Sequence, residues 1–428
     1  MKITPHRGTH QIGGTCIELQ SGDTRIVVDI GIPLTDVSGE RYNFGQFKGL
    51  SGPELVEKDV LPSVKGLYSW DKHSRPVDAI FISHSHKDHY GFLPYVSKSI
   101  PVYMSEGCKK LLGVAYYFGQ SDYDPEDAVV IKSWEGFKAG DFTVTPYLVD
   151  HSAVDAFAYL VDAGGKKVFY SGDFRGHGRK SVLFTNIKKS PPKGVDCLIL
   201  EGTCVHKDSG SSGSEADVEK ELIKIFKENR KLIVLSCSHQ NVDRISSLYR
   251  ACIRTGKTLV MIPYTAYILD KLKSISKKIP QYDIKQIKVF FEKSRYSSKM
   301  RKDKTLYKYR SSKIKYEEIE RRRNELVVLN SFFVRSRLGA KGLLKDALLV
   351  YSNWVGYFED EKPFWEKHGV PIKYVHTSGH ASVAELEQFA NAINPGKIIP
   401  IHTNYPEMFH KLFGSKVIDI NDEESIEI

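Results

Sequence analysis

The chain has 428 residues and a formal net charge of +10, and hydrophobic residues make up 41% of it, an ordinary share for a globular protein. This length predicts two domains or one large one. No apolar run reaches the roughly 18–20 residues of a membrane span, and the start, Met1–His6, lacks the apolar core of a signal peptide. The six cysteines form no CxxC pair, so we expect mostly buried, reduced thiols in a cytoplasmic protein without a membrane partner.

Short strands and loops are predicted for the first 200 residues. The strands expected from apolar and β-branched content are 26–30, 79–83, 142–147, 157–161, 167–170 and 197–200. The polar segment Asp208–Gly213 that follows predicts a flexible loop.

The middle of the chain alternates helix and strand. A helix with Val218 and Leu222 on its apolar face precedes a strand at 232–235, and a helix over 241–255 precedes a strand at 258–262. This βαβ order predicts a parallel sheet. Later, Ser382 and Glu385 form a capping box, which predicts a helix start two residues after His380. Free N–H groups at such a start favour a phosphate.

Four potential metal ligands lie within the six residues from His84 to His89, directly after the apolar strand 79–82. His84, His86, Asp88 and His89 could not all converge from one regular helix or strand. On a turn between a strand and a helix, they can face two neighbouring ions. Imidazole nitrogen together with carboxylate oxygen suits zinc or manganese.

The spacing HxHxDH after a buried strand resembles the metallo-β-lactamase superfamily. Other residues of that family's pattern fit Asp29, His151 and Asp173, each at the end of an apolar strand. The resemblance implies two Zn²⁺ ions per chain, with Mn²⁺ as the alternative, and it implies that Asp29 orients a histidine or the bridging water. The implied ligands are His84, His86 and His151 for one ion, Asp88, His89 and His402 for the other, and Asp173 as the bridge.

Three later signals resemble the β-CASP nuclease branch of that superfamily, and compact bacterial ribonuclease J-like proteins most closely. Glu201 fits its motif A, 376–381 fits motif B, and 400–403 fits motif C. The resemblance covers about Gly13 to His402. It implies an α/β protein, a metallo-β-lactamase αββα sandwich with an inserted β-CASP domain of parallel sheet flanked by helices. The expected boundaries are 1–203 and 373–428 for the first domain and 204–372 for the insertion.

The predicted function is a metal-dependent ribonuclease that hydrolyses phosphodiester bonds with a metal-bridging hydroxide, for which Asp88 and Asp173 hold the metals. His380 is the candidate general acid and Glu201 its partner, since a carboxylate beside a histidine stabilises the imidazolium. The alternative is that Glu201 only caps a strand end and that His380 binds phosphate. By the same resemblance, His376 and Ser378 hold a neighbouring phosphate.

The segment Lys293–Arg323 carries 13 Lys or Arg against 4 Asp or Glu, with four tyrosines between them. Basic side chains neutralise phosphates and aromatic rings stack on unpaired bases, so this segment, with Arg321, Arg322 and Arg323, is expected to contact RNA. The alternative is a solvated helical surface.

Three other functions compete with this prediction. The first is a DNA nuclease of the same branch. By the resemblance, His402 in motif C favours RNA over DNA, and single-stranded RNA is the expected partner. The second is a small-molecule metallo-hydrolase, which would need neither the insertion nor Glu201 and His380. The third is an inactive RNA-binding subunit, which would have lost metal ligands. Motif C reads His-Thr-Asn where ribonuclease J commonly has His-Gly-Glu. The sequence leaves open the natural RNA, the mode and polarity of cleavage, the metal in the cell and the oligomeric state.

Overall fold

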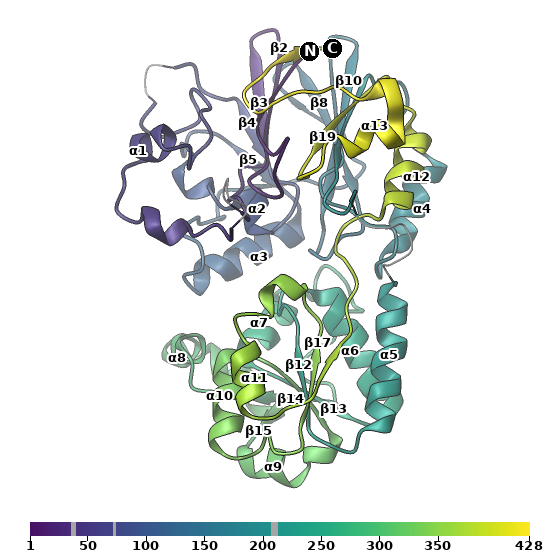
Figure 1. Cartoon of the computed structure of the whole chain (residues 1–428). Helices are drawn as coiled ribbons and strands as arrows, with labels where there is room; N and C mark the ends of the chain where they lie inside the picture. Colours follow the sequence, from purple (N-terminus) through teal and green to yellow (C-terminus); the bar gives the residue numbers. More distant parts are fainter. Residues whose placement is uncertain (36–39, 72–73, 207–212) are drawn as a thin grey trace. The chain divides into compact units, whose positions relative to one another are not determined.

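The computed structural model describes residues 1–35, 40–71, 74–206 and 213–428, which fall into two compact units (Figure 1). The first unit comprises Met1–Gly176, Lys180–Ser211 and Gly379–Ile428, and the second comprises His177–Arg179 and Ser212–Ser378. Except for Gly213, the loop predicted at 208–213 lies outside the described residues. None of the helices in the described part of the chain is both long and apolar enough to cross a membrane.

The first unit contains two sheets that share one apolar core. In strand order, the first sheet is β20 (Ile426–Glu427), β1 (Lys2–Arg7), β2 (Cys16–Ser21), β3 (Thr24–Val28), β4 (Ala79–Phe81), β5 (Val102–Met104) and β6 (Val129–Val130). The second is β19 (Lys397–Ile401), β11 (Cys197–Glu201), β10 (Lys166–Tyr170), β9 (Phe157–Ala163), β8 (Phe142–Leu148) and β7 (Phe137–Ala139). Phe81 of the first sheet and Tyr159 of the second belong to the core between them.

Helices cover the outer face of each sheet, because alternate strand residues point away from the shared core. Ile80 packs in a cluster with Leu112 of α3 (Glu106–Tyr117), beside α1 (Gly52–Glu57) and α2 (Lys87–Tyr90). Phe169 packs in another cluster with Phe389 of α12 (Val383–Ile393), beside α4 (Ser181–Lys189) and α13 (Met408–Phe413). The predicted αββα sandwich is confirmed.

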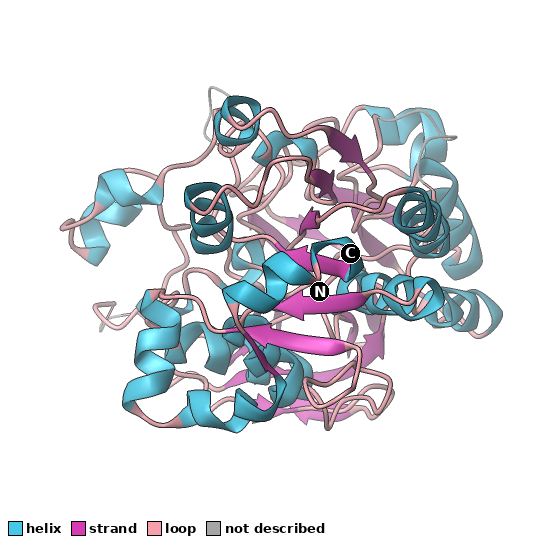
Figure 2. Cartoon of the chain, turned by 90° about the horizontal axis from the view of Figure 1, so that it is seen from below, coloured by secondary structure: helices cyan, strands magenta, loops and turns pink. Residues whose placement is uncertain are grey.

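The second unit is built on one sheet whose strand pairs are all parallel. Its order is β15 (Lys313–Ile314), β14 (Ile287–Phe290), β13 (Thr258–Met261), β16 (Leu326–Leu329), β12 (Ile233–Ser236), β17 (Leu348–Tyr351) and β18 (Ile372–Tyr374). Its helices, which Figure 2 distinguishes from the strands, are α5 (Glu215–Glu228), α6 (Val242–Thr255), α7 (Pro263–Lys271), α8 (Arg295–Lys302), α9 (Tyr316–Arg321), α10 (Phe332–Ala340) and α11 (Lys362–Lys367). The predicted parallel sheet with flanking helices is therefore present.

The chain passes between the units slightly later than the boundaries drawn from the sequence. The second unit extends to Ser378, beyond the expected end at 372. The physical reason is that the segment after β18 remains bonded to this unit: the Val375 N–H donates to the Tyr351 carbonyl at 2.9 Å, and the Thr377 hydroxyl donates to the Gly213 carbonyl. His376 and Ser378 consequently belong to the second unit, whereas His380 belongs to the first.

The elements predicted from local sequence patterns are present in the structure. Every strand predicted in the first 200 residues is present, with ends shifted by at most a few residues. Asn241 caps α6, and Gly256 ends it with a φ of 68°, a left-handed conformation that glycine adopts without strain. The capping box of Ser382 and Glu385 starts α12. The six cysteines are buried and outside disulfides, as predicted.

A buried ion pair stabilises the second unit and gives a first prediction. Arg244 and Glu215 are both 0% exposed, and Arg244 Nη2 lies 2.9 Å from Glu215 Oε1. Arg244 also donates to the Ser352 carbonyl at 2.8 Å. We expect Arg244→Met to lower the free energy of unfolding by about 3–5 kcal/mol, because the buried carboxylate of Glu215 would lose its ion pair with Arg244.

Chemical denaturation followed by tryptophan fluorescence measures this loss. The matched control is Arg254→Met. Arg254 Nη1 lies 2.9 Å from Glu219 Oε1, and the Arg254 side chain is 60% exposed. That variant should lose no more than roughly 0.2–1 kcal/mol. Equal losses in the two variants would contradict the structural role of Arg244.

Candidate metal centre

The HxHxDH run spans the turn after β4 and the first residues of α2, and backbone contacts with residues 30–32 fix its position. Ile30 N donates to the His89 carbonyl at 2.8 Å, and Ile32 N donates to the Lys87 carbonyl at 3.0 Å. Gly31 lies against this turn so closely that a Cβ there would be 1.6 Å from the Asp88 carbonyl oxygen. Only glycine at position 31 permits this approach of the two backbones.

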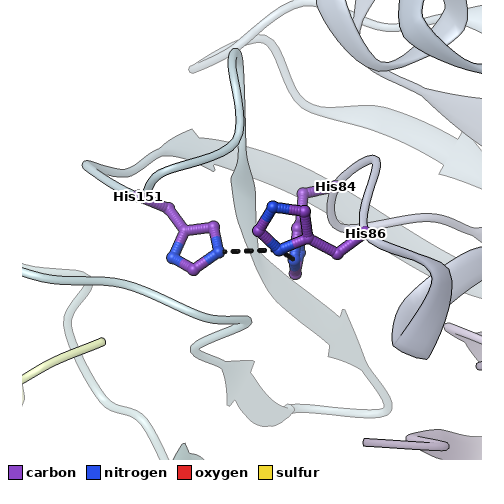
Figure 3. Close-up of side chains that lie close together, drawn as sticks. All are labelled: His84, His86 and His151. Atoms are coloured by element: carbon purple, nitrogen blue, oxygen red, sulfur yellow. Dashed lines mark hydrogen bonds between the residues drawn. The ribbon is translucent and has the colours of Figure 1, made fainter. Parts of the chain in front are cut away.

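Three histidines of the first unit form one cluster of possible ligands. His84 Nε2 lies 3.1 Å from His86 Nδ1, and His151 Nε2 lies 3.2 Å from the same atom. Figure 3 shows these ring nitrogens pointing toward one another. The opposite nitrogens have their own partners: His151 Nδ1 bonds to the Gly379 carbonyl at 2.7 Å, and His84 Nδ1 lies 3.0 Å from the Ser83 hydroxyl. Such partners fix the orientation of a ligand ring.

The protonation states of this cluster suit metal binding. Burial lowers the pKa of His84 and of His151 well below the usual range, and the neighbouring histidines lower each further. Both rings are therefore neutral near pH 7. A neutral imidazole has a free nitrogen lone pair, which is the form that binds a metal ion.

A second cluster consists of one ligand atom each from Asp88, His89, Asp173 and His402, all within 4.8 Å of one another. His402 Nε2 lies 3.2 Å from Asp88 Oδ2, and His89 Nε2 lies 3.2 Å from Asp173 Oδ2. Asp173 Oδ2 is also 3.7 Å from His84 Nε2 in the first cluster. Asp173 thus lies where one carboxylate can contact ligands of both clusters.

Unsatisfied polar atoms indicate that these residues fit a metal ion. Among the described residues, the buried side-chain atoms without a hydrogen-bond partner include both carboxylate oxygens of Asp173 and Nε2 of His89. Buried polar groups without partners are costly and rare in native proteins. A cation between these atoms would satisfy them, and His/Asp donors are those that zinc and manganese accept.

Asp29 is buried and supports the second cluster from behind. Its Oδ2 lies 2.8 Å from His89 Nδ1 and accepts the Tyr170 hydroxyl at 2.7 Å, while its Oδ1 accepts the Ser83 N–H at 2.7 Å. His89 Nε2 is thereby directed toward Asp173. Asp29 and His402 have φ angles of 62° and 55°, strained conformations that cluster at functional sites.

Glu201 and His380 adjoin the second cluster. His380 Nδ1 lies 3.3 Å from Glu201 Oε2 and 3.6 Å from Asp173 Oδ2. Burial lowers the pKa of His380, but Glu201 and Asp173 raise it, and the net value is about 10. Glu201 Oε2 also accepts the Thr203 N–H at 3.1 Å. The Glu201 carboxylate thus lies beside the imidazole of His380 as well as at the end of β11.

Two supporting contacts were missed from the sequence. The Thr203 hydroxyl lies 2.8 Å from His402 Nδ1 and orients that ring, and Tyr170 supports Asp29. Thr203 lies in the stretch Glu201-Gly202-Thr203 that fits motif A, so its closeness to Glu201 is visible in the sequence. His376, Ser378 and Arg321–Arg323, for which phosphate contacts are expected, belong to the second unit.

Comparisons with known proteins find similar domains and relatives. Residues 59–234 match the model of the beta-lactamase superfamily domain, and residues 370–413 match that of the Zn-dependent metallo-hydrolase RNA specificity domain. Ribonuclease J of Mycoplasma pneumoniae is 24% identical over 95% of this chain and 68% of its own length. Ribonuclease J of Helicobacter pylori strain J99 is 22% identical over 95% of this chain and 56% of its own length. The chain thus spans between about half and two thirds of these relatives.

Among solved structures, a protein of unknown function from Enterococcus faecalis V583 has a similar fold, with a TM-score of 0.80, 21% identity and 99% of each chain covered. The αββα fold and the His/Asp clusters define a metal-dependent hydrolase. These matches support a β-CASP ribonuclease J-like protein, similar to the beta-lactamase superfamily domain over residues 59–234 and to ribonuclease J over 95% of the chain.

Proposed function

We propose that this chain is a two-metal ribonuclease that hydrolyses the phosphodiester bonds of single-stranded RNA. The observation that carries the proposal is the arrangement of two ligand clusters, with Asp173 of the second 3.7 Å from His84 of the first and with Glu201 and His380 adjoining the second. The proposed ligands are His84, His86 and His151 for one ion, Asp88, His89 and His402 for the other, and Asp173 for both.

A pair of bound divalent ions would lower the pKa of a water and neutralise charge on the phosphodiester. The protein's own residues supply the rest. Asp29 and Thr203 orient His89 and His402 through their Nδ1 atoms. Glu201 faces Nδ1 of His380, so Nε2 is the atom that delivers a proton to the leaving oxygen. The His380 side chain is 21% exposed, which leaves it open to a substrate.

Two observations favour RNA over the other substrates. One is the match of residues 370–413, which include His380 and His402, to an RNA specificity domain, together with the ribonuclease J relatives. The other is the Glu201–His380 pair, which a small-molecule hydrolase with a good leaving group would not need. DNA remains the second candidate because its phosphodiester bond presents the same chemistry. Six buried thiols outside disulfides fit a reducing cytoplasm as the place of action.

We expect the purified protein to contain about two ions of zinc or manganese per chain and to cleave labelled single-stranded RNA faster than DNA of the same sequence. Chelator should abolish cleavage, and adding Zn²⁺ or Mn²⁺ should restore it. Elemental analysis together with gel assays of both substrates measures this. Metal well below one ion per chain in protein never exposed to chelator, or intact RNA after incubation with fully loaded protein, would refute the proposal.

A further inference from the structure

The basic segment Lys293–Arg323 contacts both edges of the parallel sheet in the second unit, so its two ends face in opposite directions. Lys293 follows β14 and therefore lies at the carboxyl edge of the sheet. His376 follows β18 and lies at the same edge, where Nδ1 is 3.2 Å from the carbonyl of Ser352, the residue after β17. In open parallel sheets ligands bind at the carboxyl edge.

The other end of the segment lies at the amino edge. Arg322 Nη2 donates at 3.1 Å to the hydroxyl of Thr258, the first residue of β13. Arg323 donates to the carbonyl of Lys345, which precedes β17. Figure 1 accordingly places α9, which ends at Arg321, and α7, which follows β13, at opposite ends of this unit.

The cations at the amino edge are also less suited to RNA. Arg322 lies 2.9 Å from Glu318 and 2.9 Å from Glu325, so two carboxylates already neutralise its guanidinium. The start of the segment, at the edge that carries His376, is therefore a better candidate for RNA contact than Arg321, Arg322 and Arg323.

A stack of three planar groups marks this start. The rings of Tyr264 and Tyr296 are stacked with centroids 5.0 Å apart and 26° between their planes. On Tyr296 lies the Arg295 guanidinium, 4.9 Å from the ring centroid, and its Nη2 donates to the Tyr296 hydroxyl at 3.2 Å. Tyr264 is only 6% exposed and forms the base of the stack, whereas Arg295 and Lys293 are exposed.

We propose that Tyr264, Tyr296 and Arg295 form a stacking ladder that receives an unpaired base of single-stranded RNA, with Lys293 and Arg295 neutralising the adjacent phosphates. This inference rests on the proposed ribonuclease function. Aromatic rings and guanidinium planes stack on any base, so the ladder binds without sequence preference. The occupant is single-stranded because paired bases are already stacked within a duplex. Glu292, which directly precedes Lys293, is buried and accepts hydrogen bonds from Ser294 and Ser297, so its carboxylate does not face the solvent where the phosphates would lie.

The test compares variants of the full-length, metal-loaded protein in binding a labelled single-stranded RNA. Stopped-flow anisotropy reads binding before cleavage, across a salt series. Tyr296→Leu removes the ring, and Tyr296→Phe keeps it. The charge variant is Lys293→Ala with Arg295→Ala. Its control, Arg230→Ala with Lys231→Ala, removes one Arg and one Lys that are exposed at the amino edge, before β12.

We expect Tyr296→Leu to weaken binding roughly 5- to 150-fold, the loss typical of one stacked base, without changing the salt slope. Tyr296→Phe should bind nearly as the parent does. The charge variant should reduce the slope of log binding constant against log salt concentration by about 1.4, or roughly 0.7 for each of two phosphate contacts. Its control should keep the parent's slope. Inorganic polyphosphate, which has no bases, should respond to the charge variant and not to Tyr296→Leu.

If Tyr296→Leu binds RNA with the parent's affinity, the stacking ladder is wrong. If the control changes the salt slope as much as the charge variant does, the segment is only a solvated basic surface. Hydrolysis of a nitrophenyl phosphodiester, too small to reach the ladder, should stay at the parent's rate in all variants. If the parent cleaves RNA and every variant binds like it, the ladder fails and the ribonuclease proposal stands. A parent that neither binds nor cleaves RNA refutes both.

Discussion

Replacing Asp173 by alanine will remove most of the bound metal and nearly all turnover on RNA. Both carboxylate oxygens of Asp173 are buried without a hydrogen-bond partner among the described residues, and Oδ2 lies within 3.7 Å of histidines from both clusters. Without this carboxylate the ions would lose a shared ligand and two negative oxygens at once. The loss of metal affinity should exceed the roughly 10- to 100-fold that removal of an outer-shell partner typically costs.

Elemental analysis after dialysis, paired with RNA cleavage rates, measures both effects. The matched control is Asp162→Ala, which removes a surface carboxylate of the same unit that pairs with Lys167 at 3.8 Å. The control should keep the parent's metal and rate. An Asp173→Ala protein that retains two ions and cleaves normally would exclude Asp173 from the centre.

The second large effect concerns the proton. His380→Ala should lower kcat on RNA roughly 10²–10⁴-fold, the usual contribution of a general acid, and leave the metal content intact. The reason is that the leaving ribose oxygen needs a proton, and His380 lies 3.3 Å from the carboxylate that holds its imidazolium form. Glu201→Gln should act in the same direction, because the amide keeps the shape and removes the charge.

The leaving group distinguishes proton transfer from simple binding. A nitrophenyl phosphodiester releases a stable anion that needs no proton, so His380→Ala should slow it far less than it slows RNA. His410→Ala is the control, since His410 is exposed and pairs with Asp419 at 2.7 Å. If both substrates lose the same factor, His380 binds phosphate and does not protonate the leaving group.

The sequence by itself determined the features that depend on neighbours in the chain. The spacing of four possible ligands directly after an apolar strand made one group recognisable: His84, His86, Asp88 and His89. Ser382 with Glu385 and Asn241 with Gly256 marked helix ends, because capping is chemistry between residues at most a few positions apart. Asp29, His151 and Asp173 were found because each ends an apolar strand in a family pattern.

The tertiary structure alone decided which distant groups meet. Glu201 reaches His380 because the segment before α12 lies at the end of β11, where the Ala381 N–H donates to Glu201 Oε1 at 3.3 Å. Thr203 reaches His402 because β11 and β19 pair in parallel and bring their carboxyl ends together. No periodicity along the chain encodes that register. The position of the basic segment is the same kind of fact: its charge is visible in the sequence, but only the strand order shows that Lys293 and Arg321 lie at opposite edges of one sheet. Spacing along the chain fixes local geometry, whereas contacts between strands depend on how the whole sheet is assembled.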